Sequence, residues 1–398
     1  MLAWLRYLLT DVGQGFCPNP LHGEHLFVTR RLDQIHRVQP RLGEPDAPDL
    51  PEHVHALILH DHARIEPGLE AMLAVLGREG AREIWHKHGT FYDHLLGVWR
   101  ILAAWRQPPE VCRLGLMHSV YSNSFVRMKV FDAEHAAGRE AVRRLIGDEA
   151  ERLVHLFCTI RREELLLLLG DAEVPVDGIE VGSLLGDRKV RLSRRDLGIF
   201  LVVTMADYAE QFFGWQDRLF ALPGRDGTRG GGPHALWPGD NRPGLWMDLS
   251  ARLGLRAAAC GIAPRPPVFE GCTAQLARAA EAEARDLYWE VVSDISLQEA
   301  PEEAGRALGE AIRLNPFLAE PHVLLAQLHL NARRFDEALA ESRRALDLLA
   351  TWATPWDKRL SWEAWIAWTR VLAKGARERD WPDTAYGVIS LGEVRPGH

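Results

Sequence analysis

The chain has 398 residues, of which 47% are hydrophobic and 26% are charged, and its formal net charge at pH 7 is −8. These values are typical of a globular protein that is long enough for two or three domains with real hydrophobic cores. The acidic balance argues against a general nucleic-acid-binding protein, which would need a clustered excess of lysine and arginine.

Cysteine usage and the lengths of the apolar segments bear on the compartment. The five cysteines are odd in number and form no Cys-x-x-Cys pair, so we expect a reduced, cytoplasmic protein without a thiolate zinc site. A membrane-spanning helix needs about eighteen or more consecutive apolar residues. No window of the sequence approaches that length, and we predict no contact with a membrane.

The first segment, residues 1–64, is predicted to be irregular because prolines recur along it. It is also rich in histidine, and His60-Asp61-His62 has the composition of a metal motif. Residues i and i+2 of a helix do not face one another, however, so we do not assign this triplet as a metal site. Between residues 65 and 85, apolar residues at helical spacing predict a helix that leads into the next segment.

Two helical patterns follow between residues 86 and 125, separated by Gln107-Pro108-Pro109. His94 lies near the start of the first pattern and His118 near the end of the second, so antiparallel packing would bring the two imidazoles together. Such a pair consists either of core histidines with satisfied hydrogen bonds or of ligands to a transition metal. The apolar residues that define the two patterns are Phe91, Leu95, Val98, Leu102 and Trp105, then Val111, Leu114, Met117 and Val120.

The next segment contains a long helical pattern over residues 139–169, and then alternating apolar residues between 170 and 192 that predict a small β-hairpin. Ser193 and Asp196 have the spacing of a capping box that starts a further helix. That helix carries Asp207 directly after a strongly apolar run. A buried carboxylate needs a partner or a metal ion, so Asp207 is a third candidate site residue.

The last part of the chain consists of a Gly/Pro-rich stretch and a helical region with an internal repeat. Residues 223–273 are predicted to be a linker and loop, and residues 274–398 are predicted to be helical. Ala304 and Ala311 recur thirty-four residues later as Ala338 and Ala345, and this pattern resembles the tetratricopeptide repeat. Fewer than three repeats rarely stand alone, so we expect this unit to pack on the preceding domain or on its own Trp-rich tail.

The residues around His94 and His118 resemble the HD-domain superfamily of helical, metal-dependent phosphohydrolases. The similarity rests on the Gly89-Thr90-Phe91-Tyr92-Asp93-His94 segment, on the spacing of twenty-four residues from His94 to His118, and on the Ala206-Asp207 pair. It covers about residues 86–215. The resemblance implies a helical domain, here residues 65–222, in which His94, His118 and Asp207 bind metal.

The sequence also departs from the pattern of that superfamily. Ser119 stands where the family has a second aspartate, which removes a charged ligand and favours a single ion, either Fe, Mn or Zn. Ser119, Asn123 and Arg127 would then lie close enough to orient a substrate. His135 and His155 occupy the stretch where related two-metal enzymes place additional histidines.

Three functions remain open on these observations. The first two are metalloenzymes that act on a small anionic substrate, through a metal-activated water in a hydrolase or through dioxygen in an iron-dependent oxygenase. The third is a non-catalytic protein-interaction scaffold with a degenerate HD core, in which the repeats bind a protein or peptide partner. The predicted fold class is the same for all three: mainly α, with an HD-like helical bundle, a small β-hairpin excursion and tetratricopeptide-like α-hairpins.

Overall fold

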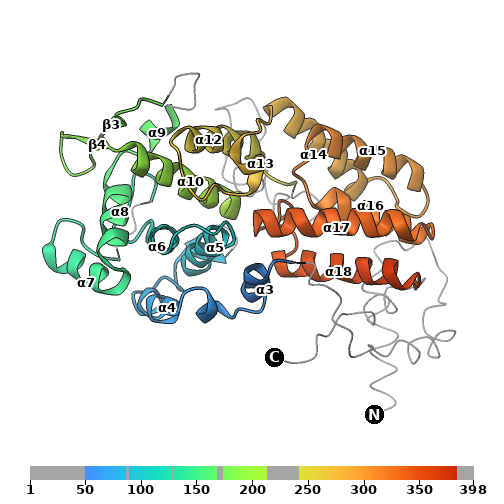
Figure 1. Cartoon of the computed structure of the whole chain (residues 1–398), viewed down its shortest axis with the longest axis horizontal. Coiled ribbons are helices and arrows are strands. Elements are labelled where there is room, and N and C mark those ends of the chain that lie inside the picture. Colours follow the sequence, from blue (N-terminus) through green and yellow to red (C-terminus); the bar gives the residue numbers. More distant parts are fainter. Residues whose placement is uncertain (1–49, 87–88, 127–129, 168–173, 213–241, 383–398) are drawn as a thin grey trace, which may run out of the picture.

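The computed structural model describes residues 50–86, 89–126, 130–167, 174–212 and 242–382 (Figure 1). Regular structure in these ranges is mainly helical, as predicted, and the strands form two small antiparallel sheets. No helix within the described ranges has the length and apolar character required to cross a membrane.

The helices that surround the candidate site come from residues 50–272. Their bounds are α3 (Glu52–Ile58), the short 3-10 helix η1 (His62–Arg64), α4 (Leu69–Arg78), α5 (Phe91–Ala104), α6 (Pro109–Met117), α7 (Ala136–Ile146), α8 (Asp148–Thr159), α9 (Glu163–Leu167), α10 (Arg194–Gln211), α12 (Met247–Ala259) and α13 (Val268–Cys272). Strands β1 (Trp85–His86) and β2 (Gly89–Thr90) pair just before α5, and β3 (Ile179–Gly182) and β4 (Lys189–Leu192) form the predicted β-hairpin.

Helices α5 and α6 form the expected hairpin, and the sequence fixes where each helix begins. Helix α5 starts at a capping box in which the Thr90 hydroxyl accepts the Asp93 backbone N–H and the Asp93 carboxylate accepts the Thr90 N–H. Helix α6 starts at Pro109, a position where the missing backbone N–H costs nothing. A side chain at Gly115 would come within 2.2 Å of Leu102, so this glycine lets the two helices approach closely.

Helix α10 is buried on almost every side, as expected of a helix that is apolar all round. It packs against α5, α6 and α12, and Figure 1 shows it between these elements. The Ser193 hydroxyl accepts the Asp196 N–H at 3.0 Å, so the helix begins where the capping pattern predicted. This placement brings the second half of α10 against the α5–α6 hairpin.

The long helical pattern over residues 139–169 proves to be interrupted twice. Gly147, with a φ of 90°, separates α7 from α8, and Ile160 adopts an extended conformation after α8. Few residues other than glycine adopt a positive φ readily, and acidic residues enriched in the first turn of α8 are favourable at a helix N-terminus. Three shorter helices therefore replace the single predicted one.

The segment predicted to be a linker and loop, residues 223–273, contains α12 and α13 in its second half, and α12 packs directly on α10. A side chain at Gly254 would come within 3.2 Å of Met205, so the two helices are in close contact. The first segment differs in a similar way, because residues 50–64 form α3 and η1 rather than irregular chain.

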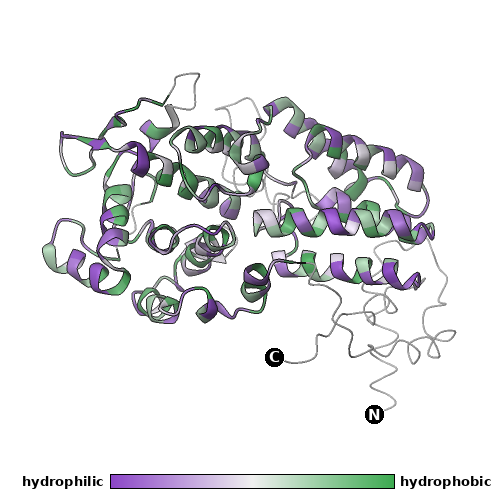
Figure 2. Cartoon of the chain, viewed as in Figure 1, coloured by the Kyte–Doolittle hydropathy of each residue, from purple (hydrophilic) through white to green (hydrophobic). Residues whose placement is uncertain are grey.

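The C-terminal unit is a series of antiparallel helices. It comprises α14 (Arg278–Ser293), α15 (Pro301–Leu314), α16 (Glu320–Asn331), α17 (Phe335–Trp352) and α18 (Trp362–Glu378). The four alanines of the predicted repeat are all fully buried, as expected for small residues where two helices approach. Figure 2 shows hydrophilic and hydrophobic residues alternating along α17 and α18, as expected of helices with one buried face.

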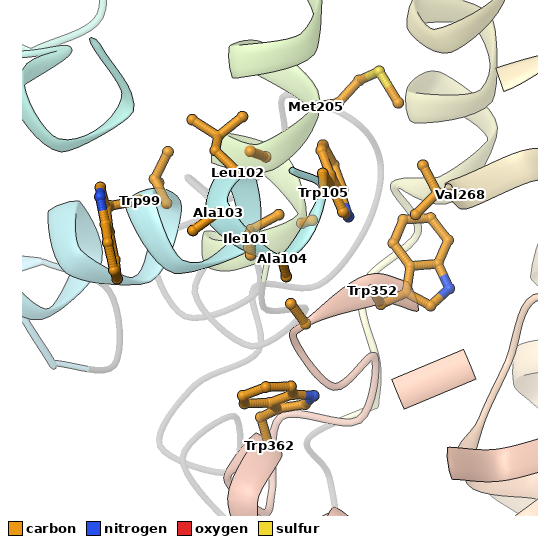
Figure 3. Close-up of a cluster of buried hydrophobic side chains, with 14 of the residues drawn as sticks. Trp99, Ile101, Leu102, Ala103, Ala104, Trp105, Met205, Val268, Trp352 and Trp362 are labelled. Atoms are coloured by element: carbon orange, nitrogen blue, oxygen red, sulfur yellow. The ribbon is translucent and has the colours of Figure 1, made fainter. Parts of the chain in front are cut away.

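A cluster of tryptophans joins this C-terminal unit to the bundle. Figure 3 shows Trp105, directly after α5, on the side of this cluster that faces Trp352 of α17, whereas Trp99 of α5 lies at the far side. The Trp105 indole donates to the backbone oxygen of Thr351 at 2.8 Å, and Arg100 pairs with Glu363 at 2.8 Å. Because the tryptophans of this tail are largely buried here, they favour a core role over the peptide-binding groove.

Candidate metal centre

Three buried side chains from three elements meet inside the bundle. His94 belongs to the first turn of α5, His118 caps the end of α6 and Asp207 lies near the end of α10. Their exposed fractions are 3%, 2% and 4%. One nitrogen or oxygen atom from each lies within 4.8 Å of the others, so the group could hold a metal ion.

The separations between these atoms agree with the dimensions of a metal site. The Nε2 atoms of His94 and His118 are 3.3 Å apart, and Asp207 Oδ1 lies 3.4 Å from the first and 3.9 Å from the second. Ligands about 2.0–2.1 Å from a tetrahedral zinc ion are about 3.3–3.4 Å from one another. Two of the three separations match this value, and a tetrahedral ion would require His118 Nε2 and Asp207 Oδ1, now 3.9 Å apart, to move about 0.5 Å closer together.

Hydrogen bonds on the outer nitrogens orient both imidazoles. His94 Nδ1 bonds to the carboxylate of Glu210, and His118 Nδ1 bonds to the backbone oxygen of Gly115 at 2.7 Å. A backbone carbonyl and an ionised carboxylate have no proton to donate, so each Nδ1 must carry the proton of its ring. In the neutral rings the Nε2 atoms are then unprotonated, and each is directed at the other ring. Carboxylate and carbonyl partners of this kind typically hold metal-binding histidines in place.

The two oxygens of Asp207 have different surroundings. Oδ2 accepts a hydrogen bond from Nη2 of Arg162 at 3.1 Å, whereas Oδ1 faces the imidazoles and accepts from the side-chain amide of Gln211. The amide oxygen of Gln211 in turn accepts from His86 Nε2 at 3.0 Å. Since Arg162 engages Oδ2, the carboxylate offers a single oxygen to the site, which suits one ion.

The charges of the group are strongly coupled. Burial lowers the pKa of His118 to about 4, so this imidazole is neutral. Burial also disfavours the charged form of His94, but the carboxylates of Glu210 and Asp207 outweigh it and raise the pKa of His94. For Asp207, burial raises the pKa, but the neighbouring Arg162 and His94 outweigh it, and the pKa of Asp207 is lowered. In the absence of a metal ion, the two carboxylates thus favour the protonated form of His94 more than burial disfavours it.

Two of the three residues predicted to orient a substrate form hydrogen bonds within the local chain. Ser119 and Asn123 are buried, and the Asn123 amide donates to the Ser119 hydroxyl at 2.7 Å. The Asn123 side-chain oxygen accepts two backbone N–H groups, from Phe125 and Val126, so this side chain holds the turn after α6. Arg127, the third predicted residue, lies outside the described residues.

The additional histidines have partners of their own. His135 is exposed and pairs with Asp132 at 2.8 Å, while His155 is half-buried and bonds to the backbone oxygen of Ala133. Neither joins the group formed by His94, His118 and Asp207. His60 and His62 contact each other edge to face, and His62 packs against Trp99.

Four residues around the centre were not predicted from the sequence: Glu210, Gln211, Arg162 and His86. Glu210 could have been predicted from the sequence, because it lies three residues after Asp207 and therefore on the same face of the helix. Gly97 opposite it supports the same placement, since a side chain there would come within 2.7 Å of Glu210. Arg162 lies in the turn between α8 and α9, where helical spacing carries no information.

Comparison with known proteins gives one match. The sequence model of a domain of unknown function (DUF6817) matches residues 75–162. This span contains His94, His118 and Arg162 and ends before α10, which carries Asp207 and Glu210. No curated protein and no solved structure matches the chain.

Proposed function

We propose that this chain is a metalloenzyme that acts on a small anionic substrate. In this proposal His94, His118 and Asp207 hold one divalent ion. One observation carries the proposal. Two buried imidazoles, each with its outer nitrogen already bonded, direct their other nitrogens at each other 3.3 Å apart and beside a carboxylate oxygen. A cation between these three atoms satisfies all of them at once.

A proton is the alternative to a metal ion. His94 as an imidazolium would donate from Nε2 to His118 or to Asp207, and the raised pKa of His94 favours this arrangement. The group would then be a buried ion pair, and burying charges in this way stabilises a fold little or not at all. The choice of metal over proton rests on the three separations and on the supporting bonds to both rings.

Each surrounding residue has a definite task in the proposed centre. Glu210 and the Gly115 carbonyl fix the two rings, while Gln211 and Arg162 fix the Asp207 carboxylate. Phe157 packs edge to face against His118 and adds to an apolar surrounding that excludes bulk water. These contacts hold three donor atoms in place before any ion arrives, as an efficient site requires.

A divalent ion with three protein ligands and an open position supplies Lewis acidity and lowers the pKa of a coordinated water. This chemistry suits attack on a phosphoryl or carboxyl centre, and we propose hydrolysis as the reaction. Two histidines and one carboxylate with open positions also suit iron-dependent oxygenases. The identity of the ion therefore distinguishes the two reactions.

The scaffold function is the second candidate. It is supported by the helical hairpins of residues 278–378, whose type of architecture often binds peptides. The observation against it is that the apolar tail residues pack into the protein, as described above for Trp352 and Trp362. A scaffold would have no need of an ion at His94 and His118.

The test is metal analysis of the full chain, purified without a histidine tag, by inductively coupled plasma mass spectrometry. The Asp207→Ala variant is measured beside it. Near-stoichiometric manganese, zinc or magnesium that is lost in the variant supports the hydrolase, and iron lost in the same way supports the oxygenase. A protein that takes up no metal, even after incubation with each ion, contradicts the proposal and favours the scaffold.

The reaction is tested on the metal-loaded protein with a panel of small phosphate esters and carboxylate esters. Hydrolysis is expected to require the metal and to disappear in the His118→Ala variant. Hydrolysis that persists equally after chelation and in that variant would come from a contaminant or from another site.

A further inference from the structure

Arg162 is a deeply buried arginine beside the candidate centre. It lies in the turn between α8 and α9 with an exposed fraction of 4%, and its Nη2 donates to Asp207 Oδ2 at 3.1 Å. Its backbone N–H donates to the hydroxyl of Ser124 at 3.1 Å, which ties the turn to the chain after α6. The guanidinium is therefore held one carboxylate away from the atoms that face the proposed ion.

The guanidinium has more donors than its surroundings use. A guanidinium carries five N–H groups in a planar fork and no acceptor. Among the described residues, the side chain of Arg162 has one hydrogen-bond acceptor, Asp207, and its Nε is buried without any partner. An unpaired buried donor on a charged group is costly, and such groups in native proteins call for an explanation.

Two aromatic rings accompany the guanidinium. Its central carbon lies 4.1 Å from the ring centre of Phe157 and 5.3 Å from that of Phe125. Phe157 is fully buried, whereas Phe125 is 56% exposed. Rings can hold the position of an arginine through cation–π contacts without using its N–H groups. The Nε donor thus remains unpaired on a side chain that contacts both Asp207 of the centre and the exposed ring of Phe125.

We propose that Arg162 binds an oxyanion, the phosphate or carboxylate group of the substrate, next to the ion held by His94, His118 and Asp207. The assignment as a substrate group rests on the proposed function. Arginine is the residue best suited to planar recognition of such anions. The positive charges of a divalent ion and of Arg162 also exceed the negative charges of Asp207 and Glu210. The metal-loaded centre therefore retains a positive charge, which a bound anion would balance.

The test measures the affinity of the full chain for inorganic phosphate and for acetate by isothermal titration calorimetry, with and without bound zinc. Wild-type protein is compared with Arg162→Gln, which keeps a donor for Asp207, and with Arg162→Lys, which keeps the charge. The matched control is Arg161→Gln, a change at the exposed neighbouring arginine. Metal content and far-ultraviolet circular dichroism are recorded for every variant.

We expect phosphate or acetate affinity to fall at least tenfold in Arg162→Gln, to fall less in Arg162→Lys, and to stay within twofold in Arg161→Gln. The anion that binds more tightly identifies the group that the substrate carries. A protein that binds zinc normally but shows unchanged anion affinity in both Arg162 variants overturns this inference and leaves the metal proposal intact. Arg162-dependent anion binding in a protein that binds no metal supports the anion site and contradicts the metal proposal.

Discussion

Two sets of buried carboxylates in this molecule have opposite uses. In the C-terminal part, Glu281 is fully buried and accepts hydrogen bonds from the backbone N–H groups of Trp246, Met247 and Asp248. Its carboxylate thereby caps the start of α12. In the bundle, Glu210 and Asp207 accept mainly from side chains, and they surround two imidazoles whose free nitrogens face each other. A carboxylate that bonds to backbone N–H groups fixes the course of the chain.

Glu320 extends the comparison. It is also fully buried, and one of its oxygens accepts the backbone N–H groups of Trp356 and Asp357 at 2.7 and 3.0 Å. Burial raises the pKa of Glu320 to about 7, yet its contacts are again with the chain itself. A shifted pKa therefore does not mark a functional site by itself. Because Oε2 of Glu320 is also buried without a partner, the better criterion is whether unused atoms from several side chains converge on one point, as at His94, His118 and Asp207.

The largest effect is expected at the centre. His118→Ala should lower metal affinity by about 100- to 1,000-fold, because structural zinc sites with four protein ligands gain about 10–16 kcal/mol in total, or about 2.5–4 kcal/mol per ligand. Competition with a chromogenic chelator measures this loss, and circular dichroism should show the helical fold retained. His155→Ala, a change at a half-buried histidine outside the group, is the control. Equal metal affinity in both variants would exclude His118 as a ligand.

The second prediction concerns the capping carboxylate. Glu281→Ala should lower the free energy of unfolding by about 3 kcal/mol, because three backbone N–H groups lose their acceptor in a buried setting. Metal affinity should not change. Urea denaturation measures the effect, and Glu283→Ala, on the exposed side of the same helix, should be nearly neutral. A loss of metal without a loss of stability would reverse the roles assigned to the two carboxylate sets.

Glu210→Gln is the matching change in the bundle. Glutamine can still accept the proton of His94 Nδ1, but it lacks the negative charge, so metal affinity should fall by about 10- to 100-fold. The free energy of unfolding of the metal-free protein should change by less than in Glu281→Ala. Unchanged metal affinity would show that Glu210, like Glu281, has only a structural role.

The smallest effect per step of the measurement, one pH unit, is expected where the two parts meet. Lys358, between α17 and α18, donates to the backbone oxygen of Ala209 at 2.7 Å, and burial lowers its pKa from 10.5 to about 7. The unfolded chain holds this proton to a higher pH, so the free energy of unfolding should rise between pH 7 and 10, by at most about 1.4 kcal/mol per pH unit. Below pH 7 the buried lysine is protonated in the folded protein as well, and the free energy of unfolding is lowered by the full cost of burying its charge.

Lys358→Met should remove this rise, whereas Lys189→Met, on the exposed strand β4, should leave it unchanged. Urea denaturation at several pH values provides the measurement. An identical pH profile in wild type and Lys358→Met would mean that the lysine is not desolvated at this junction.

Local periodicity predicted much of this fold. The α5–α6 hairpin, the β-hairpin and the start of α10 follow from helical spacing, alternation and a capping residue, all of which act within a few positions of the chain. The break at Gly147 was missed because the apolar period continues across it. Helix α12 was missed because it follows a Gly/Pro-rich stretch, and its position depends on contacts with α10 that no local pattern reveals.

The candidate centre shows the same limit. His94 and His118 were brought together by reasoning on an antiparallel pair, and Asp207 by the cost of burying a carboxylate. Arg162 was missed because it lies in a turn, and its relation to Asp207 spans forty-five residues. Substrate contacts assigned to Ser119 and Asn123 rested on nearness in sequence, whereas in the structure the Asn123 side chain bonds to the adjacent turn.

The central claim is that one metal ion lies between His94, His118 and Asp207. The most direct test is anomalous X-ray diffraction, recorded at the absorption edge of the ion that the protein retains. We predict a single peak per chain, about 2.0–2.2 Å from Nε2 of both histidines and from Oδ1 of Asp207. A peak elsewhere, or a metal-soaked crystal without a peak between these three atoms, would contradict it.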